Sequence, residues 1–171
     1  MNKILFIITG SIAASRCKEI IALLNINEVK ISCILTKEAK KYVKISDIKK
    51  LLKNRIFTDE DEKKNKMLHI NLSRDNDIIV VCPATANSIA KFANGYGDNL
   101  ASNTLLASNK KILFVPAMNS FMWHNKINQK NVRLLKDIGH EFIGPKVGKL
   151  KCGEFGLGRI DNSKNLSLIH I

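Results

Sequence analysis

The sequence predicts a single α/β domain of three layers, in which helices cover both faces of a doubly wound parallel sheet. The chain has 171 residues, which is about the length of one domain. It alternates short, β-branched apolar runs with helical stretches. The apolar runs are almost continuous rather than alternating with polar residues, which is typical of parallel strands that are buried on both faces.

Four apolar runs are the expected strands of this sheet. They are residues 4–8 (ILFII), 29–35 (VKISCIL), 77–82 (DIIVVC) and 111–115 (KILFV). Cys33 and Cys82 lie inside two of these runs, so we expect both to be small core residues.

Four stretches between the strands are expected to be helices, namely residues 11–24, 47–53, 85–94 and 128–138. Gly139 follows the last of them and is expected to end that helix. In the first helix, helical spacing places five apolar residues on the side that faces the sheet: Ile12, Cys17, Ile20, Ile21 and Leu24.

Two segments are expected to lie outside the sheet. Residues 59–66 (DEDEKKNK) are a block of charge that we expect to form a solvated, mobile loop. Residues 144–159 hold five of the nine glycines of the chain. This segment is too rich in glycine for a helix or strand and suits a flap that closes over a site.

Charge and composition exclude several classes of function. The net charge is +13, but it comes from 23 lysines and only 5 arginines, and aromatic residues make up 6% of the chain. Base recognition favours arginine and stacking aromatic side chains, so we expect no nucleic-acid partner. No apolar run approaches the roughly 18 residues of a membrane span, and residues 3–8 are too short for a signal peptide. We therefore expect a cytoplasmic protein without a membrane partner.

The four cysteines are far apart and form no C-x-x-C pair, so we expect reduced thiols and no metal site. Cys152 differs from the other three. It lies among glycines, between Lys151 and Arg159, and is expected to be neither a core residue nor a disulfide partner. Nearby cations would favour its thiolate and make it available for proton or electron chemistry.

Ligands of open α/β sheets bind beyond the carboxyl ends of the strands, where two motifs follow the first two expected strands. Thr9-Gly10-Ser11-Ile12 combines a glycine turn with a serine at a helix start. Its free N–H groups can bind an anion, or the segment is a plain capped turn. Thr36 can add a hydroxyl to the same anion or cap a helix.

Two further motifs follow the third and fourth expected strands. In residues 83–87 (PATAN), small residues let a flat ring approach the backbone, and Thr85 and Asn87 can orient it. In residues 116–119 (PAMN), Asn119 can both donate and accept, which suits a carboxylate or an amide. Each motif can also be a helix cap. His69, ahead of the third strand, is a candidate base or a structural histidine.

Taken together, these motifs resemble the homo-oligomeric flavin-containing cysteine decarboxylases. The resemblance covers Lys3 to about Ile160 and implies a Rossmann-like or flavodoxin-like sheet. Two departures from the family pattern are Lys151, where alanine is usual, and Asn99, where a second aspartate is common. The motifs that carry it, in family order, are GSIAA (10–14), His69-Ile70, PATANSIAK (83–91), GYGDNLAS (95–102), PAMNSFMW (116–123) and CGEFGLGR (152–159).

The resemblance also implies a site. His69 would be the catalytic base, Asn119 would hold the substrate carboxylate and Cys152 would supply a proton. The implied FMN contacts are Gly10, Ser11, Ile12 and Thr36 for the phosphate, and Thr85, Ala86, Asn87 and Ala117 for the isoalloxazine ring. The implied substrate contacts are Asn119, Met122, Cys152, Gly153 and Arg159.

The activity that the resemblance implies is FMN-dependent decarboxylation of 4′-phosphopantothenoylcysteine to 4′-phosphopantetheine in coenzyme A biosynthesis. It implies a homo-oligomer built from trimers. Two alternatives stay open. A peptidyl-cysteine oxidative decarboxylase shares the first half-reaction but lacks the flap cysteine. A non-catalytic, flavin-binding regulatory subunit carries an acidic tail or has lost catalytic residues.

The domain is expected to end near residue 165. Residues 166–171 (LSLIHI) match one reading frame of a common sequencing adapter, so we expect a non-native tail. In the family, a phosphopantothenate–cysteine ligase domain commonly follows, and it would then be missing here. The alternative is a genuine short C-terminus.

Overall fold

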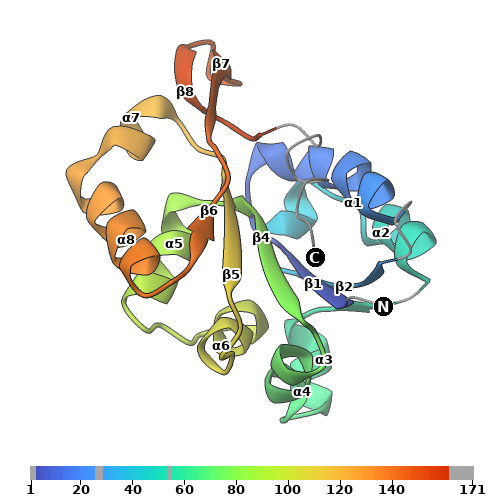
Figure 1. The fold of residues 1–171 in the computed structure, drawn as a ribbon. Helices are drawn as coiled ribbons and strands as arrows, with labels where there is room; N and C mark the ends of the chain where they lie inside the picture. The colour runs from blue at the N-terminus through green and yellow to red at the C-terminus, as the bar shows by residue number, and fades with distance from the viewer. Residues whose placement is uncertain (1–2, 26–28, 54, 162–171) are drawn as a thin grey trace.

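The computed structural model describes residues 3–25, 29–53 and 55–161, and within them it confirms the expected fold class. Six parallel strands form one sheet in the order β3-β2-β1-β4-β5-β6, with helices on both faces, and two further strands form a separate hairpin (Figure 1). The expected tail, residues 166–171, lies outside the described residues.

The elements follow one another as a doubly wound domain. The strands of the sheet are β1 (Lys3–Ile8), β2 (Lys30–Leu35), β3 (Ile56–Phe57), β4 (Ile78–Ala84), β5 (Ile112–Pro116) and β6 (Glu141–Phe142), and the hairpin consists of β7 (Lys146–Lys149) and β8 (Phe155–Arg159). The helices are η1 (Ile12–Arg16), α1 (Cys17–Asn25), η2 (Ala39–Lys41), α2 (Ile45–Leu52), α3 (Asp59–Lys64), α4 (Leu68–Arg74), α5 (Ala86–Ala93), α6 (Leu100–Leu106), α7 (Ser120–His124) and α8 (Lys126–Asp137), of which η1 and η2 are 3₁₀-helices.

The four expected strands form the centre of the sheet and are buried on both faces, which explains their continuous apolar runs. One face packs against η1, α1 and α2, and the other packs against α4, α5, α6 and α8. Cys33 and Cys82 are fully buried in the first of these cores, as expected. Burial raises the pKa of the Cys33 thiol, so this side chain stays a neutral core residue.

The expected loop at residues 59–66 was wrong, because residues 59–64 form helix α3. The Thr58 backbone N–H and side-chain hydroxyl both donate to Asp61 Oδ2, at 2.8 and 3.0 Å. This pairing fixes the first turn of the helix, and the acidic residues that follow stabilise its N-terminus. The charged run at residues 59–64 is therefore a capped surface helix.

The expected inward position of Ile12 was also wrong, whereas the other four apolar residues of that helix are buried. Ile12 is 49% exposed because the chain there forms the 3₁₀-helix η1 before α1 begins, which changes the direction of its side chain.

The glycine-rich segment is not irregular but forms the β7–β8 hairpin, which stands beside α7 at one end of the molecule (Figure 1). Gly148 and Gly156 face each other across the two strands. A Cβ at Gly156 would lie 2.8 Å from Ser120 Oγ, and one at Gly158 would lie 2.1 Å from the Met118 carbonyl oxygen. The glycines therefore permit close backbone packing of this flap rather than disorder.

Candidate functional site

The carboxyl ends of β1, β2, β4 and β5 meet at one edge of the sheet, as parallel packing requires. The residues after these ends line a cavity of about 440 Å³, a volume typical of cofactor sites. Seven of the residues expected to bind FMN line this cavity: Gly10, Ser11, Thr36, Thr85, Ala86, Asn87 and Ala117.

The backbone of this cavity is shaped by Gly10 and by hydroxyl side chains. A Cβ at Gly10 would lie 2.4 Å from the Glu38 Cβ, so only glycine lets the β1 turn pass the loop after β2. Ser11 Oγ accepts from the Ala13 N–H at 3.2 Å, and Thr85 Oγ1 accepts from the Ser88 N–H at 3.1 Å. Both residues therefore cap helices, as one reading of each motif expected, and also line the cavity.

A second cavity, of about 680 Å³, adjoins the first and shares Ser11, Ala117 and Met118 with it. It also holds Ile12, the eighth residue expected to bind FMN. Its lining carries four cationic side chains from three parts of the chain: Arg16, Lys149, Lys151 and Arg159. This cavity suits a ligand that carries negative charge.

Asn119 lies in the lining of this second cavity and points its amide toward the tip of the flap. Its Oδ1 accepts from the Phe121 N–H at 2.8 Å, which caps α7 and leaves Nδ2 free to donate elsewhere. Nδ2 lies 2.5 Å from Glu154 Oε2 and 3.5 Å from Cys152 Sγ. The structure thus brings together Asn119, which is expected to bind the substrate carboxylate, and Cys152, which is expected to donate a proton. The two residues are 33 positions apart in the chain.

The flap is held against this asparagine by its backbone. The Met118 N–H donates to the Gly158 carbonyl at 3.0 Å, and the Leu150 N–H donates to the Glu154 carbonyl at 2.8 Å across the hairpin tip. Gly153 occupies the left-handed region, with φ of 91°, at that tip. Cys152 is exposed and free of a disulfide, as expected.

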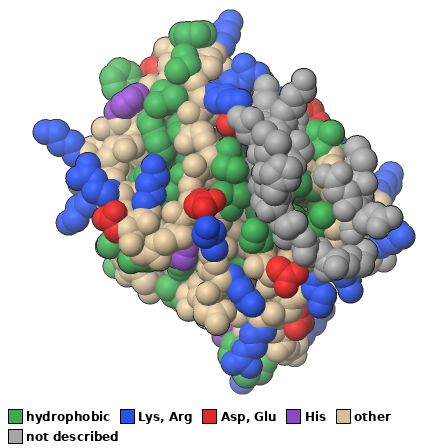
Figure 2. Space-filling model, viewed as in Figure 1, with side chains coloured by type: hydrophobic (Ala, Val, Ile, Leu, Met, Phe, Trp, Pro, Cys, Tyr) green, Lys and Arg blue, Asp and Glu red, His purple; other side chains and the backbone are tan. Residues whose placement is uncertain are grey.

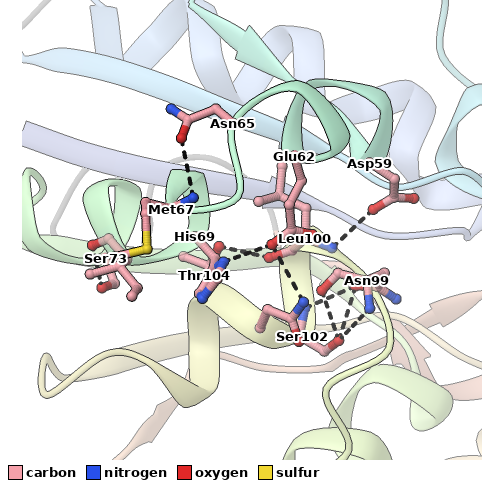
Figure 3. A network of polar contacts seen from close by, with 12 residues as sticks. Asp59, Glu62, Asn65, Met67, His69, Ser73, Asn99, Leu100, Ser102 and Thr104 are labelled. Atoms are coloured by element: carbon pink, nitrogen blue, oxygen red, sulfur yellow. Dashed lines mark hydrogen bonds and ion pairs between the residues drawn. The ribbon is translucent and has the colours of Figure 1, made fainter.

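His69 lies elsewhere, near the first turn of α4, and lines neither cavity. Its Nδ1 is 2.7 Å from Glu62 Oε1 on α3, and the Asn103 amide donates to the same oxygen at 3.4 Å. Figure 3 shows this pair beside the Asp59 carboxylate, which accepts from the Leu100 N–H at 2.9 Å. The structure of one chain therefore does not join His69 to Asn119 and Cys152.

The remaining expected substrate contacts divide between the two cavities. Met122 is half exposed and lines the first cavity. Gly153 and Arg159 line the second, beside Cys152.

Sequence reasoning missed Glu62 and Glu154. Residues 58–61 could have been interpreted as a helix start, with Thr58 as the N-cap and Asp61 as the third residue of the helix. That interpretation places Glu62 in the first turn of a helix. No sequence signal would have found Glu154, because its contact with Cys152 depends on the turn at Gly153, where φ is 91°.

Within residues 3–25, 29–53 and 55–161, no three His, Cys, Asp or Glu side chains lie close enough to share a metal ion. In the same ranges, every helix is too short or too polar to cross a membrane.

Comparison with known proteins agrees with this geometry. The sequence profile of the Flavoprotein family matches residues 1–169. The chain is 32% identical over 163 residues to a probable phosphopantothenoylcysteine decarboxylase of Streptococcus mutans, covering 93% of this chain and 91% of that protein. It is 34% identical over 161 residues to the coenzyme A biosynthesis bifunctional protein CoaBC of Haemophilus influenzae, but covers only 40% of that protein against 93% of this chain.

A solved structure shows the same fold throughout. It is a cysteine-to-serine mutant of PPC decarboxylase in complex with pantothenoylaminoethenethiol, with 28% sequence identity and a TM-score of 0.88, and the match covers 98% of this chain and 94% of that one. The expected family resemblance is confirmed over almost the whole chain. On this evidence the chain belongs to the Flavoprotein family, with decarboxylases of coenzyme A biosynthesis among its relatives.

Proposed function

We propose that this protein is an FMN-dependent decarboxylase that converts 4′-phosphopantothenoylcysteine to 4′-phosphopantetheine in the cytoplasm. The observation that carries this proposal is the contact of Asn119 with Cys152 in the lining of the second cavity, which adjoins the first. The name of the Streptococcus mutans relative supports the same reaction, and that of the Haemophilus influenzae relative supports a role in coenzyme A biosynthesis.

The first cavity fits a flavin, because small side chains and the backbone of Gly10 leave a wide space at the sheet edge. Residues at the ends of β1 and β2 would hold the phosphate, and residues at the ends of β4 and β5 would face the ring. The chemistry that FMN supplies when bound is reversible acceptance of a hydride from the carbon next to the substrate sulfur. That oxidation gives the carboxylate a neighbouring C=S group into which its bond electrons can move on loss of CO2.

The side chains of the protein perform the binding and proton transfers. Asn119 would donate from Nδ2 to the substrate carboxylate in place of its present contact with Glu154, since its Oδ1 is engaged by the Phe121 N–H. His69 would accept the proton of the substrate thiol. Cys152 would give its Sγ proton to the carbon that has lost CO2.

His69 must reach the site from another copy of the chain, so we propose a homo-oligomer built from trimers. In support, large apolar side chains are exposed around the flap and α7: Phe121 (78%), Met122 (49%), Ile127 (73%), Val147 (61%) and Phe155 (77%). Such a group is more than a monomer usually exposes and suits contact with a second chain.

The cations of the second cavity would bind the 4′-phosphate of the substrate. We do not expect nucleic acid to bind, because lysine and arginine side chains are scattered over the face in Figure 2 rather than gathered in one stripe. We also infer that residues 1–165 form the decarboxylase domain, since the match covers 91% of the Streptococcus mutans protein but only 40% of CoaBC of Haemophilus influenzae.

Two features oppose the alternative functions. Cys152 next to Asn119 would be unnecessary in a peptidyl-cysteine decarboxylase, which releases the enethiol without reducing it. The intact His69–Glu62 and Asn119–Cys152 pairs would be unnecessary in a non-catalytic flavin-binding regulator.

The test is to purify the protein, record its flavin spectrum and incubate it with 4′-phosphopantothenoylcysteine, with the product identified by mass. We expect CO2 and 4′-phosphopantetheine. A Cys152→Ser variant should give a product lighter by about two mass units, the unreduced enethiol. A His69→Asn variant should release no CO2. A colourless protein that cannot take up FMN would refute the proposal.

A further inference from the structure

We propose that Asn128 is a positioning residue that fixes the side chain of Met118, a residue in the wall of both cavities. Met118 lines the first cavity and the second, as Ser11 and Ala117 do. The Asn128 amide, on α8, donates from Nδ2 to Met118 Sδ at 3.5 Å, within hydrogen-bond distance for sulfur. The inference rests on the proposed function for the identity of the substrate, but the contact itself is independent of any ligand.

The neighbours of Asn128 fix the orientation of its amide. Nδ2 also donates to the Trp123 carbonyl oxygen, at 3.3 Å. A carbonyl oxygen and a thioether sulfur can only accept, so the nitrogen of the amide must face both of them. Asn128 is therefore the donor to Met118, and its Oδ1 points away from the sulfur.

This orientation leaves a buried acceptor unsatisfied. Asn128 is 7% exposed, and among the residues that the structure describes no donor reaches its buried Oδ1. A buried carbonyl without a partner lowers the stability of a fold. The Trp123 carbonyl does not depend on Asn128 either, because the Gln129 amide donates to the same oxygen at 2.6 Å. Stability alone therefore does not account for an asparagine here, whereas its contact with Met118 does.

The contact matters because a methionine side chain has three rotatable bonds and adapts to the space around it. The backbone of Met118 is already held by the flap, since its N–H donates to the Gly158 carbonyl at 3.0 Å. The hydrogen bond from Asn128 fixes the sulfur at the other end of the residue. Ligands in both cavities then meet one defined conformer of Met118, which lowers the entropy cost of binding them.

The direct test observes the Met118 methyl group by NMR in the full-length protein as purified, with ¹³C-labelled methionine methyl groups. The chain has four methionines, so Met118→Leu assigns the Met118 resonance by its disappearance. The ¹³C shift of this methyl depends on the torsion about the Cγ–Sδ bond and therefore reports averaging between rotamers. We expect Asn128→Leu to move the Met118 resonance toward its position in the urea-unfolded protein.

Two matched variants separate the donor from its surroundings. Asn128→Ala removes the same donor but leaves empty the space that leucine fills, and it should move the Met118 resonance in the same direction. Gln129→Leu removes the neighbouring donor to Trp123 and should leave that resonance unchanged. An unchanged Met118 resonance in both Asn128 variants would overturn the inference. Failure of both variants to fold would overturn it as well, because the asparagine would then be required for stability.

Flavin binding measures the consequence of the contact. The holoprotein is diluted stepwise, and the fluorescence of the released FMN gives its Kd. We expect Asn128→Leu to raise this Kd about fivefold, the effect of losing one hydrogen bond. In a Met118→Leu background, Asn128→Leu should leave the Kd unchanged, because Asn128 acts through the sulfur.

An equal rise of the Kd in both backgrounds would show that Asn128 acts by another route and would refute the inference. A wild-type protein that binds FMN but releases no CO2 refutes the proposed function alone. If the wild-type protein binds no FMN, the proposed function fails, and the Met118 methyl resonance still decides the role of Asn128.

Discussion

Glu62 and Glu154 each contact a side chain with a proposed catalytic role, and both contacts join carboxylates to groups that carry protons. Glu62 Oε1 lies 2.7 Å from His69 Nδ1, so Nε2 is the ring nitrogen left to face a substrate in the proposed role. The amide of Asn103, on α6, donates to the same carboxylate oxygen at 3.4 Å. The orientation of the base is thus set by two neighbouring helices.

Replacing Glu62 with Gln should therefore lower kcat for CO2 release at least about tenfold, because the imidazole loses the carboxylate that orients it. KM should change little, since Glu62 lines neither cavity. Glu62→Asp should restore part of the loss. The matched control is Glu60→Gln on the same helix, where the carboxylate pairs with Lys40 at 3.0 Å instead. Equal kcat in Glu62→Gln and Glu60→Gln would contradict the role of Glu62.

Helix α3 and the flap hairpin are the two elements that deliver these carboxylates. Helix α3 was not expected, because its sequence looks like a solvated charge run, and the flap was expected without its two strands, because its glycines look flexible. In both, a local device fixes the backbone. Helix α3 has its Thr58–Asp61 cap, and the flap has glycines that pack against the loop before α7.

The cap predicts the stability of α3. Thr58→Ala removes the hydroxyl that donates to Asp61 Oδ2 and should lower the free energy of unfolding by about 1 kcal/mol. Urea denaturation followed by circular dichroism measures this change. Ser at the same position retains a hydroxyl and should recover most of the stability; a Thr58→Ala protein as stable as the wild type would show that the cap contributes nothing.

The close packing of the flap leads us to expect that one added methyl group will displace it. In Gly158→Ala the new Cβ would meet the Met118 carbonyl at 2.1 Å, so the flap must move away from Asn119. We expect a loss of about 1–3 kcal/mol in stability and more enethiol among the products. Lys49→Ala, at an exposed side chain on α2 that lines neither cavity, should change neither quantity.

At the scale of the whole molecule, His140 makes the stability of the fold depend on pH. Burial lowers the pKa of His140 below its ordinary value of 6.5, and its Nδ1 accepts from the Ile112 N–H at 3.3 Å. As the pH falls below about 6.5, the unfolded chain binds a proton before the folded chain does, so stability is lost toward acid. It is fully present above that pH.

The urea midpoint should accordingly be lower at pH 5.5 than at pH 7.5, and His140→Gln should reduce this difference. Glutamine keeps an acceptor for the Ile112 N–H but does not titrate. His124→Gln, at an exposed histidine on α7, should keep the wild-type difference. If His140→Gln retains it as well, other groups are responsible for the pH dependence.

Because the structure of one chain does not join His69 to Asn119, we predict that an interface between two chains completes the site. Chains with His69→Asn and chains with Asn119→Asp should each be inactive alone. Co-expressed, they should form mixed oligomers with activity well above either variant, because one interface then joins an intact histidine to an intact asparagine. Light scattering should give a multiple of three chains. A monomeric active protein would contradict this arrangement.

The sequence by itself determined the central sheet and the positions of the binding motifs. Strands buried on both faces must be apolar without interruption, and the residues after parallel strand ends must meet at one edge. The seven residues of the first cavity that the family resemblance implies as FMN contacts lie after strand ends, in agreement with that rule. Short-range patterns carry this information, so it can be read along the chain.

Only the tertiary structure decided which charged side chains act on His69 and Cys152. The Asn119–Glu154 contact joins residues 35 positions apart, and it depends on how a hairpin docks on a loop. The separation of His69 from the flap likewise depends on packing between helices and the sheet. Such contacts arise from the fold as a whole, because the residues around a side chain in the sequence do not specify which distant side chain will lie next to it.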